Sequence, residues 1–212
     1  MESKHSKDEE TTGTTLIAVE SKDGVVIATD SRTSSGSFIS SRITNKISPI
    51  SDHIVGLRSG ITSDSQAIFD IVKYYAEAHS ILDDEPILVY NVAQYARKFA
   101  YNYRDQLSFG VIIAGYDEEK QGQIYATTSG GYSIRQKVYI SGSGSTFVYG
   151  YIDKNYHEGM SNEKAAELVA NAVFLAKRRD ANSGGVICLA TIDKDGVHQK
   201  IIRPDMPDHP KI

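Results

Sequence analysis

The order of the apolar segments constrains the fold of this chain more than any other feature, because segments of one kind come in pairs. Short apolar runs typical of strands occupy residues 15–19, 25–29, 53–58, 109–116, 123–128, 186–192 and 197–202. Apolar residues at helical spacing follow Ser63, recur over 92–103, and are expected again near Ser143 and after Ser161. A parallel sheet needs helices that alternate singly with strands, so paired strands and paired helices predict antiparallel sheets layered with helices.

Length and composition fit one globular domain. Of the 212 residues 40% are apolar and 24% are charged, which is ordinary for a soluble fold. A formal net charge of -4 gives no reason to expect nucleic acid or an anionic membrane as a partner. No stretch approaches the roughly 20 apolar residues of a membrane helix. Cys188 is the single cysteine, which favours a reducing cytosolic or nuclear compartment.

A polar leader meets the first apolar strand at Gly13-Thr14. Residues 1–12 contain no aliphatic side chain beyond Met1, and they lack the apolar region of a secretory signal. Cleavage after Gly13 would give Thr14 a free α-amine beside its own hydroxyl. An α-amine, with a pKa of about 7.7–8.0, can act as the base for that hydroxyl. Taken alone, the junction is better explained by a disordered tail before an ordinary threonine.

A threonine nucleophile needs a cation near its hydroxyl and an anion that holds the cation. Asp30 ends the second predicted strand, sixteen residues after Thr14, and Lys46 begins a later strand after sixteen more. If both strands lie beside the first, the two side chains can meet Thr14. Arg32 projects to the same strand face as Asp30 and could anchor the same network. Spacing alone favours a surface ion pair, or no pair.

Other polar residues stand at predicted ends of strands and helices. Gly60 follows a strand, where a backbone N–H can serve as a donor to an oxyanion, although a simple turn explains it equally. Ser143 stands at an expected helix start, and Asp180 and Ser183 lie three residues apart in a loop that an Asx-type turn would also explain. The six histidines show no metal-ligand spacing, so the sequence predicts no metal site.

Together these segments resemble the catalytic beta subunits of the proteasome core particle, from about Gly13 to Ile202. Six blocks occur in the order of that family: Gly13-Thr14-Thr15, Thr29-Asp30-Ser31-Arg32-Thr33, Asn45-Lys46-Ile47, Arg58-Ser59-Gly60, Gly142-Ser143-Gly144-Ser145 and Arg179-Asp180-Ala181-Asn182-Ser183-Gly184-Gly185. Unrelated chains would not reproduce six blocks in register, so the joint match outweighs the simpler explanation of each block.

The resemblance implies a four-layer α/β/β/α sandwich of the N-terminal nucleophile hydrolase type, with antiparallel sheets. It divides the chain into a propeptide at 1–13 that autocleavage removes, a catalytic domain at 14–202 and an extended C-terminal arm at 203–212. It also implies stacked seven-membered rings with two copies of this subunit among other beta and alpha subunits, in the cytoplasm and nucleus, with regulatory caps as indirect partners. No metal or organic cofactor is expected.

The resemblance also assigns roles to single residues. It makes Thr14 the nucleophile, with Gly13 before the processing site. Asp30 and Lys46 become the activating pair. By its negative charge, Asp30 should keep Lys46 protonated, so that the ammonium group stabilises the Thr14 alkoxide and is not itself the base. A neutral Lys46 that acts as the base stays open as an alternative. The remaining roles are a supporting network of Ser143, Asp180 and Ser183, an oxyanion donor in the Gly60 amide, and substrate-binding residues Thr33, Ser34, Thr44, Arg58 and Thr62.

Arg58 indicates the beta-1 class, which cleaves after acidic residues, because other active classes have a small or apolar residue there. The implied function is a threonine endopeptidase that degrades unfolded, chiefly ubiquitin-tagged polypeptides. Two alternatives stay open, namely a non-catalytic ring subunit used for assembly and another N-terminal nucleophile hydrolase that acts on small amides. Ser34-Ser35 and Ala181-Asn182 depart mildly from the family's pattern, and neither departure removes a catalytic group.

Overall fold

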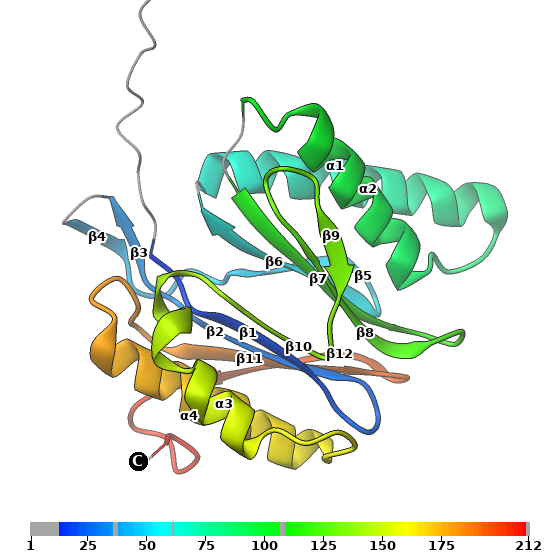
Figure 1. Ribbon diagram of the computed structural model, residues 1–212. Helices are drawn as coiled ribbons and strands as arrows, with labels where there is room; N and C mark the ends of the chain where they lie inside the picture. Colours follow the sequence, from blue (N-terminus) through cyan, green and yellow to red (C-terminus); the bar gives the residue numbers. More distant parts are fainter. Residues whose placement is uncertain (1–12, 36–37, 61, 107–108, 211–212) are drawn as a thin grey trace, which may run out of the picture.

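Two five-stranded antiparallel sheets form the centre of the protein, whose computed structural model describes residues 13–35, 38–60, 62–106 and 109–210 (Figure 1). The first sheet has the spatial order β10 (Val138–Ser141), β1 (Leu16–Glu20), β2 (Val25–Asp30), β11 (Ile187–Asp193) and β12 (Gly196–Ile202). The second has the order β5 (Ile47–Ser51), β6 (Ile54–Gly60), β7 (Phe109–Asp117), β8 (Gln121–Thr127) and β9 (Ser133–Arg135). The short strands β3 (Thr33–Ser35) and β4 (Phe38–Ser41) pair with each other.

Helices cover the outer faces of both sheets, so the chain builds four layers (Figure 1). The second sheet carries α1 (Thr62–Asp83) and α2 (Val89–Asn102), and the first carries α3 (Tyr149–Asn155) and α4 (Asn162–Arg179). The pairing of like elements predicted from the sequence is therefore confirmed. Among the described helices, none combines the length and the apolar content that a membrane crossing would need.

Three clusters of buried apolar side chains join the four layers. Leu16 of the first sheet and Leu57 of the second belong to the cluster between the sheets. Ile17 belongs with Val173 of α4 to the cluster on one outer face, and Ile113 belongs to the cluster beneath α1 and α2. Since neighbouring residues of β1 face opposite clusters, both faces of the strand are buried. This explains why β1 and β2 are continuous apolar runs without polar alternation.

Several local predictions agree with the structure, and the shortest elements were missed. The Ser161 hydroxyl accepts a hydrogen bond from the Lys164 amide at 3.4 Å and caps α4, as expected for a helix after Ser161. The helix expected near Ser143 begins as a 3-10 turn, η1 (Ser143–Phe147), before α3. Sequence reasoning did not predict β3, β4, β9 or β10, because three or four residues are too few to show a periodic pattern.

Residues 203–210 fold back beneath α4 (Figure 1), whereas the sequence predicted an extended arm at 203–212, of which residues 211–212 lie outside the described part. Two successive turns form as the Met206 amide donates to the Arg203 carbonyl and the His209 amide to the Met206 carbonyl, both at 3.1 Å. The His209 ring then packs edge-on against Phe174, with centroids 5.1 Å apart. Prolines at every third position from Pro204 explain the turns, since each fixes its own φ.

Candidate active site

Thr14 lies just before β1, between the 3-10 turn that begins at Ser143 and the loop that carries Asn182. Its side chain is buried, and its hydroxyl donates to the Gly13 carbonyl at 2.8 Å. Its amide donates to Ser143 Oγ at 3.2 Å, and its carbonyl accepts from the Gly144 amide at 3.3 Å. A Cβ on Gly13 would lie 1.7 Å from the Cβ of Asn182, so only glycine fits before this threonine. The peptide bond between Gly13 and Thr14 is thus closely packed on the side of Asn182.

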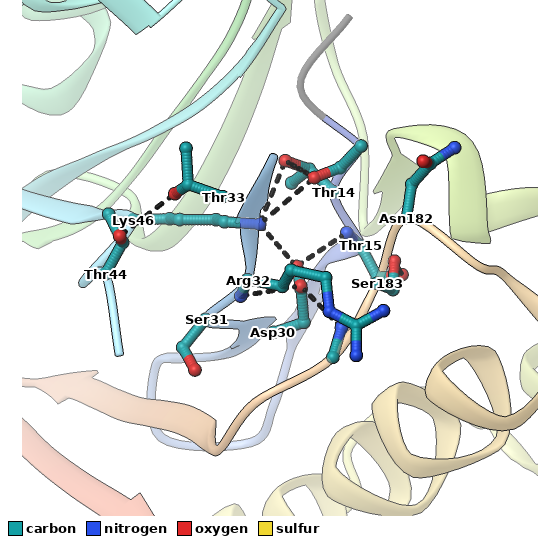
Figure 2. Close-up of polar contacts among 12 residues, drawn as sticks. Thr14, Thr15, Asp30, Ser31, Arg32, Thr33, Thr44, Lys46, Asn182 and Ser183 are labelled. Carbon is teal, nitrogen blue, oxygen red and sulfur yellow. Dashed lines mark hydrogen bonds and ion pairs between the residues drawn. The ribbon is translucent and has the colours of Figure 1, made fainter. Parts of the chain in front are cut away.

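Lys46 links Thr14 to a buried carboxylate (Figure 2). Its Nζ lies 2.6 Å from Asp30 Oδ1, 3.0 Å from Thr14 Oγ1 and 3.4 Å from the Gly13 carbonyl oxygen, so all three ammonium donors have acceptors. Lys46 is 5% exposed and Asp30 is fully buried. The ammonium group therefore lies against both the hydroxyl of Thr14 and the carbonyl that precedes it.

The two charged residues reach Thr14 from opposite sheets. Asp30 is the last residue of β2, which neighbours β1 as the sequence predicted. Lys46 instead precedes β5, an edge strand of the second sheet. The arrangement considered from the sequence, with both residues on strands beside the first, therefore holds for Asp30 and does not hold for Lys46. Its long side chain spans the space between the sheets, which is why the contact forms in spite of that placement.

Burial and a neighbouring charge act in opposite directions on Lys46. Removal from water penalises the ammonium form and lowers the pKa of Lys46 below that of an exposed lysine. The Asp30 carboxylate opposes this shift, both by its charge and by its hydrogen bond. The pKa of Lys46 is thus lowered by burial, while its ion pair with Asp30 favours the charged form.

A second polar network supports Thr14 from the other side. Asp180 Oδ2 accepts hydrogen bonds from Ser143 Oγ and from Ser183 Oγ, each at 2.6 Å. Ser143 in turn receives the Thr14 amide. Sequence reasoning missed Thr15, whose hydroxyl lies 2.7 Å from Ser183 Oγ and extends this network. The structure thus brings the predicted serines and aspartate together around Thr14.

A small cavity opens beside the threonine. The residues that line it come from the segment before β1, from β3 and the segments before β3 and β5, from β6 and from α1. They are Thr14, Arg32, Thr33, Thr44, Lys46, Arg58, Gly60 and Ser65. Thr33 and Thr44 are joined by a hydrogen bond between their hydroxyls at 2.9 Å. A larger hollow, of about 590 Å³, lies between α4, β12 and the C-terminal turns, but it is remote from the buried Asp30–Lys46 pair. The chemistry therefore identifies the smaller cavity as the candidate site.

Two of the predicted substrate-binding residues are not seen in this cavity: Ser34 lies elsewhere, and the side chain of Thr62 is not described. Ser34 is buried, and its hydroxyl has no hydrogen-bond partner within the described ranges. Thr62 begins α1, and its side chain lies outside the part of the chain that is described.

The cavity also contains Ser65 on the first turn of α1, which the sequence did not single out as a site residue. Gly60 has φ of 96°, which places this cavity-lining residue in the region that favours glycine.

Replacing Gly142 with alanine should lower the free energy of unfolding by about 1–3 kcal/mol, because φ of 88° with ψ of 176° is a conformation nearly restricted to glycine. The new Cβ would also lie 2.0 Å from the Thr14 carbonyl oxygen. Urea unfolding of the subunit measures the change. Gly150→Ala is the matched control, since its Cβ would meet nothing within 4 Å. Equal stability of the two variants would contradict the prediction.

The arrangement supplies the groups that hydroxyl-based acyl transfer requires. Thr14 provides a hydroxyl, Lys46 a cation in contact with it, and Asp30 the anion that holds the cation. In the described part of the chain, no group of three or more histidine, cysteine, aspartate or glutamate side chains is placed to hold a metal ion. The candidate site is therefore centred on the contact of Thr14 with the Asp30–Lys46 pair.

Comparisons with known proteins identify the family of this chain. A family profile described as "Proteasome subunit" matches residues 10–192. "Proteasome subunit beta type-9" of Bos taurus is 45% identical over 194 residues, which cover 92% of this chain and 88% of the relative. "Probable proteasome subunit beta type-1" of Schizosaccharomyces pombe is 41% identical over 193 residues (91% and 85%), and "Proteasome subunit beta type-6" of Dictyostelium discoideum is 44% identical over 191 residues (90% and 89%). The chain therefore belongs to the proteasome subunit family, as a beta-type member.

Proposed function

We propose that this chain is a threonine endopeptidase of the proteasome core, of the N-terminal nucleophile hydrolase type and the beta-1 class, that cleaves peptide bonds after acidic residues. The observation that carries the proposal is the contact of a buried ammonium group with a threonine hydroxyl, at 3.0 Å between Lys46 Nζ and Thr14 Oγ1. A buried Asp30–Lys46 pair costs desolvation free energy. Its position against a hydroxyl is better explained by catalysis than by stability.

The first reaction is cleavage of the chain's own Gly13–Thr14 bond. Thr14 Oγ attacks the Gly13 carbonyl carbon, and a water takes the hydroxyl proton and passes it to the Thr14 nitrogen. The C–N bond then breaks, and an ester between Gly13 and Thr14 Oγ replaces the amide. Hydrolysis of that ester releases residues 1–13 with a carboxylate at Gly13 and leaves Thr14 with a free α-amine. Support comes from Lys46 Nζ, which lies near both Thr14 Oγ1 and the carbonyl oxygen of Gly13.

The freed amine then serves as the base in substrate hydrolysis. It accepts the proton of Thr14 Oγ, which attacks the substrate carbonyl, and it returns the proton to the leaving amine. The Gly60 amide, at the edge of the same cavity, donates to the developing oxyanion, and Lys46 stabilises the negative charge on Oγ. Water completes the cycle by hydrolysing the acyl ester. Ser143, Asp180 and Ser183 hold the amine in place during these steps.

Arg58 determines the substrate in this proposal. It lies on β6, partly buried, and lines the cavity beside Thr14. A guanidinium group offers a planar fork of donors that matches a carboxylate. Thr33 and Thr44 line the same cavity, and the backbone of β3 with Ser34 would bind the substrate as an added strand. The favoured substrates are thus peptides with Asp or Glu before the scissile bond.

The assembly belongs to the same proposal. The chain acts within stacked rings beside other beta and alpha subunits, and the substrates are unfolded, chiefly ubiquitin-tagged polypeptides of the cytoplasm and nucleus. Membership of the family supports partnership with other proteasome subunits. A free threonine at the start of the mature chain would distinguish this proposal from a subunit used only for assembly.

Mass spectrometry of the subunit from native particles tests the proposal most directly. The mature chain should begin at Thr14, and a threonine-directed epoxyketone should add its mass to that residue. Thr14→Ala is the control, and it should retain residues 1–13 and stay unlabelled. A native particle whose subunit keeps residues 1–13, or whose Thr14 resists the epoxyketone, would overturn the assignment.

A further inference from the structure

Arg32 connects the end of β2 to the loop that carries Asp180 and Ser183. Its Nη1 donates to the Ala181 carbonyl at 2.6 Å, which is the carbonyl of the residue next to Asp180. In Figure 2 its side chain points from the backbone beside Asp30 toward the side of the site where Ser183 lies. This contact joins two segments that are 149 residues apart in the sequence.

The guanidinium group occupies a space that exists only because residue 184 is glycine. A Cβ on Gly184 would lie 2.4 Å from each of Arg32 Cζ, Nε and Nη2. The planar group therefore rests directly against the backbone of the loop at one end, while Nη1 holds Ala181 at the other. A lysine could supply one donor to that carbonyl, but it could not lie flat against Gly184.

The two oxygens of Asp30 divide their contacts between the catalytic lysine and this loop. Oδ1 accepts from Lys46 Nζ at 2.6 Å and from the Thr15 amide at 2.9 Å. Oδ2 accepts from the Arg32 amide at 3.1 Å and from the Gly184 amide at 3.0 Å. The loop is thus fixed to β2 by two groups, the Asp30 carboxylate and the Arg32 guanidinium.

The position of this loop sets the network around Thr14. Asp180 holds Ser143 and Ser183 through hydrogen bonds of 2.6 Å, and Ser143 receives the Thr14 amide. Contacts this short are lost when the loop moves by an ångström, and displacements of that size can lower a catalytic rate by about 10²-fold. A group that fixes the loop therefore affects the reaction without touching the substrate.

We propose that Arg32 is a positioning residue that clamps the loop of residues 180–185, so that Asp180 can hold Ser143 against the Thr14 nitrogen. The inference rests on the proposed function, since it assigns Arg32 a task within that reaction. Arg32 also lines the cavity beside Thr14, so a direct contact with the substrate is the competing explanation. The two explanations differ in which kinetic constant changes.

The experiment compares assembled particles that carry Arg32→Ala, Arg32→Lys or the control Arg97→Ala, with the other active subunits silenced. Arg97 is an exposed arginine of α2 whose hydrogen bond is to Gln94, outside the site. In Arg32→Ala, kcat for a Glu-directed peptide should fall roughly ten- to a hundredfold, with KM within about twofold. Free guanidinium at non-denaturing concentrations should restore part of kcat, because it fits the vacated space. Arg97→Ala should show neither effect.

Hydrogen exchange gives a second measurement that does not depend on activity. Peptides that cover 180–186 should exchange faster in Arg32→Ala, because the Ser183 amide donates to the Asp180 carbonyl and the Gly184 amide to Asp30. Arg32→Lys should show a smaller loss of kcat that guanidinium does not restore. It serves as the decisive variant if Arg32→Ala does not assemble, and wild-type kcat and exchange in Arg32→Lys would then overturn the proposal.

Other outcomes separate this inference from the proposed function. A rise in KM at constant kcat in Arg32→Ala would assign Arg32 to substrate binding and overturn the clamp, as would unchanged kinetics and exchange. A Lys46→Ala particle assayed alongside tests the proposed function itself. If Lys46→Ala is inactive while Arg32→Ala behaves like wild type, only the inference about Arg32 fails. If Lys46→Ala stays active, the proposed function fails, and exchange alone still tests the clamp.

Discussion

Replacing Lys46 with alanine is expected to lower peptide hydrolysis by at least ~100-fold in an assembled particle and to leave residues 1–13 attached. Nζ lies 3.0 Å from Thr14 Oγ1 and 3.4 Å from the Gly13 carbonyl oxygen, so the variant loses the only cation in hydrogen-bond contact with either atom within the described ranges. Turnover of a Glu-directed peptide and the mass of the subunit measure the two effects. Lys194→Ala, an exposed lysine paired with Asp195, is the control and should match wild type.

Lys46→Arg separates charge from geometry in the same assay. Arginine keeps the positive charge, but its planar group cannot reproduce three contacts made from one nitrogen atom, so most activity should be lost.

In wild type, activity should fall at alkaline pH as Lys46 loses its proton. Because burial lowers the pKa of Lys46, this decline should occur below the ~10.4 of an exposed lysine. Near-normal turnover in Lys46→Ala would refute the role of Lys46.

Replacing Arg58 with methionine should remove the preference for acidic residues. A carboxylate before the scissile bond pairs with the guanidinium, whereas a large apolar side chain would leave that charged group desolvated and unpaired. The penalty is about 1–3 kcal/mol, or roughly ten- to a few-hundredfold in kcat/KM. We expect kcat/KM for a Glu-ending peptide to fall by that factor in Arg58→Met, and the value for a Leu-ending peptide to rise.

Fluorogenic peptides that end in Glu, Leu and Arg measure this preference, with the other active subunits silenced. Arg97→Met is the matched control, since it removes an exposed guanidinium outside the cavity, and it should keep the wild-type order of substrates. The peptide that ends in Arg should be poor in wild type because it brings like charges together. A wild type with no preference for Glu, or a preference that survives Arg58→Met, would remove Arg58 from this role.

The sequence predicted the chemical groups of the site better than their layout. Thr14, Asp30 and Lys46 sit in short blocks that resemble a known family, and membership of that family is confirmed. Which sheet Lys46 lies beside depends on the course of the chain after Asp30, where the described residues of 31–46 form the short strands β3 and β4 and irregular segments. No periodic pattern in that segment indicates which sheet the next strand joins.

The sequence also could not predict contacts that depend on the close approach of a side chain or loop to a distant backbone segment. The space for Arg32 against Gly184 and the packing of Gly13 against Asn182 follow from the paths of two loops in three dimensions. A glycine in a sequence does not indicate which distant residue will fill the space it leaves. By contrast, the long apolar runs and Ser161 at a helix start depend on neighbouring residues, and these predictions agree with the structure.

Asp30 ends a strand of the first sheet and Lys46 directly precedes a strand of the second, so the proposed activity should depend on how the two sheets are aligned. A small sliding of one sheet over the other would lengthen the 2.6 Å ion pair while leaving every strand and helix intact. Leu16 and Leu57, in the apolar cluster between the sheets, help to fix that alignment. The apolar side chains packed between the two sheets therefore also keep the Asp30–Lys46 pair in register. A substitution among them should reduce catalysis at a smaller displacement than the one that unfolds the subunit.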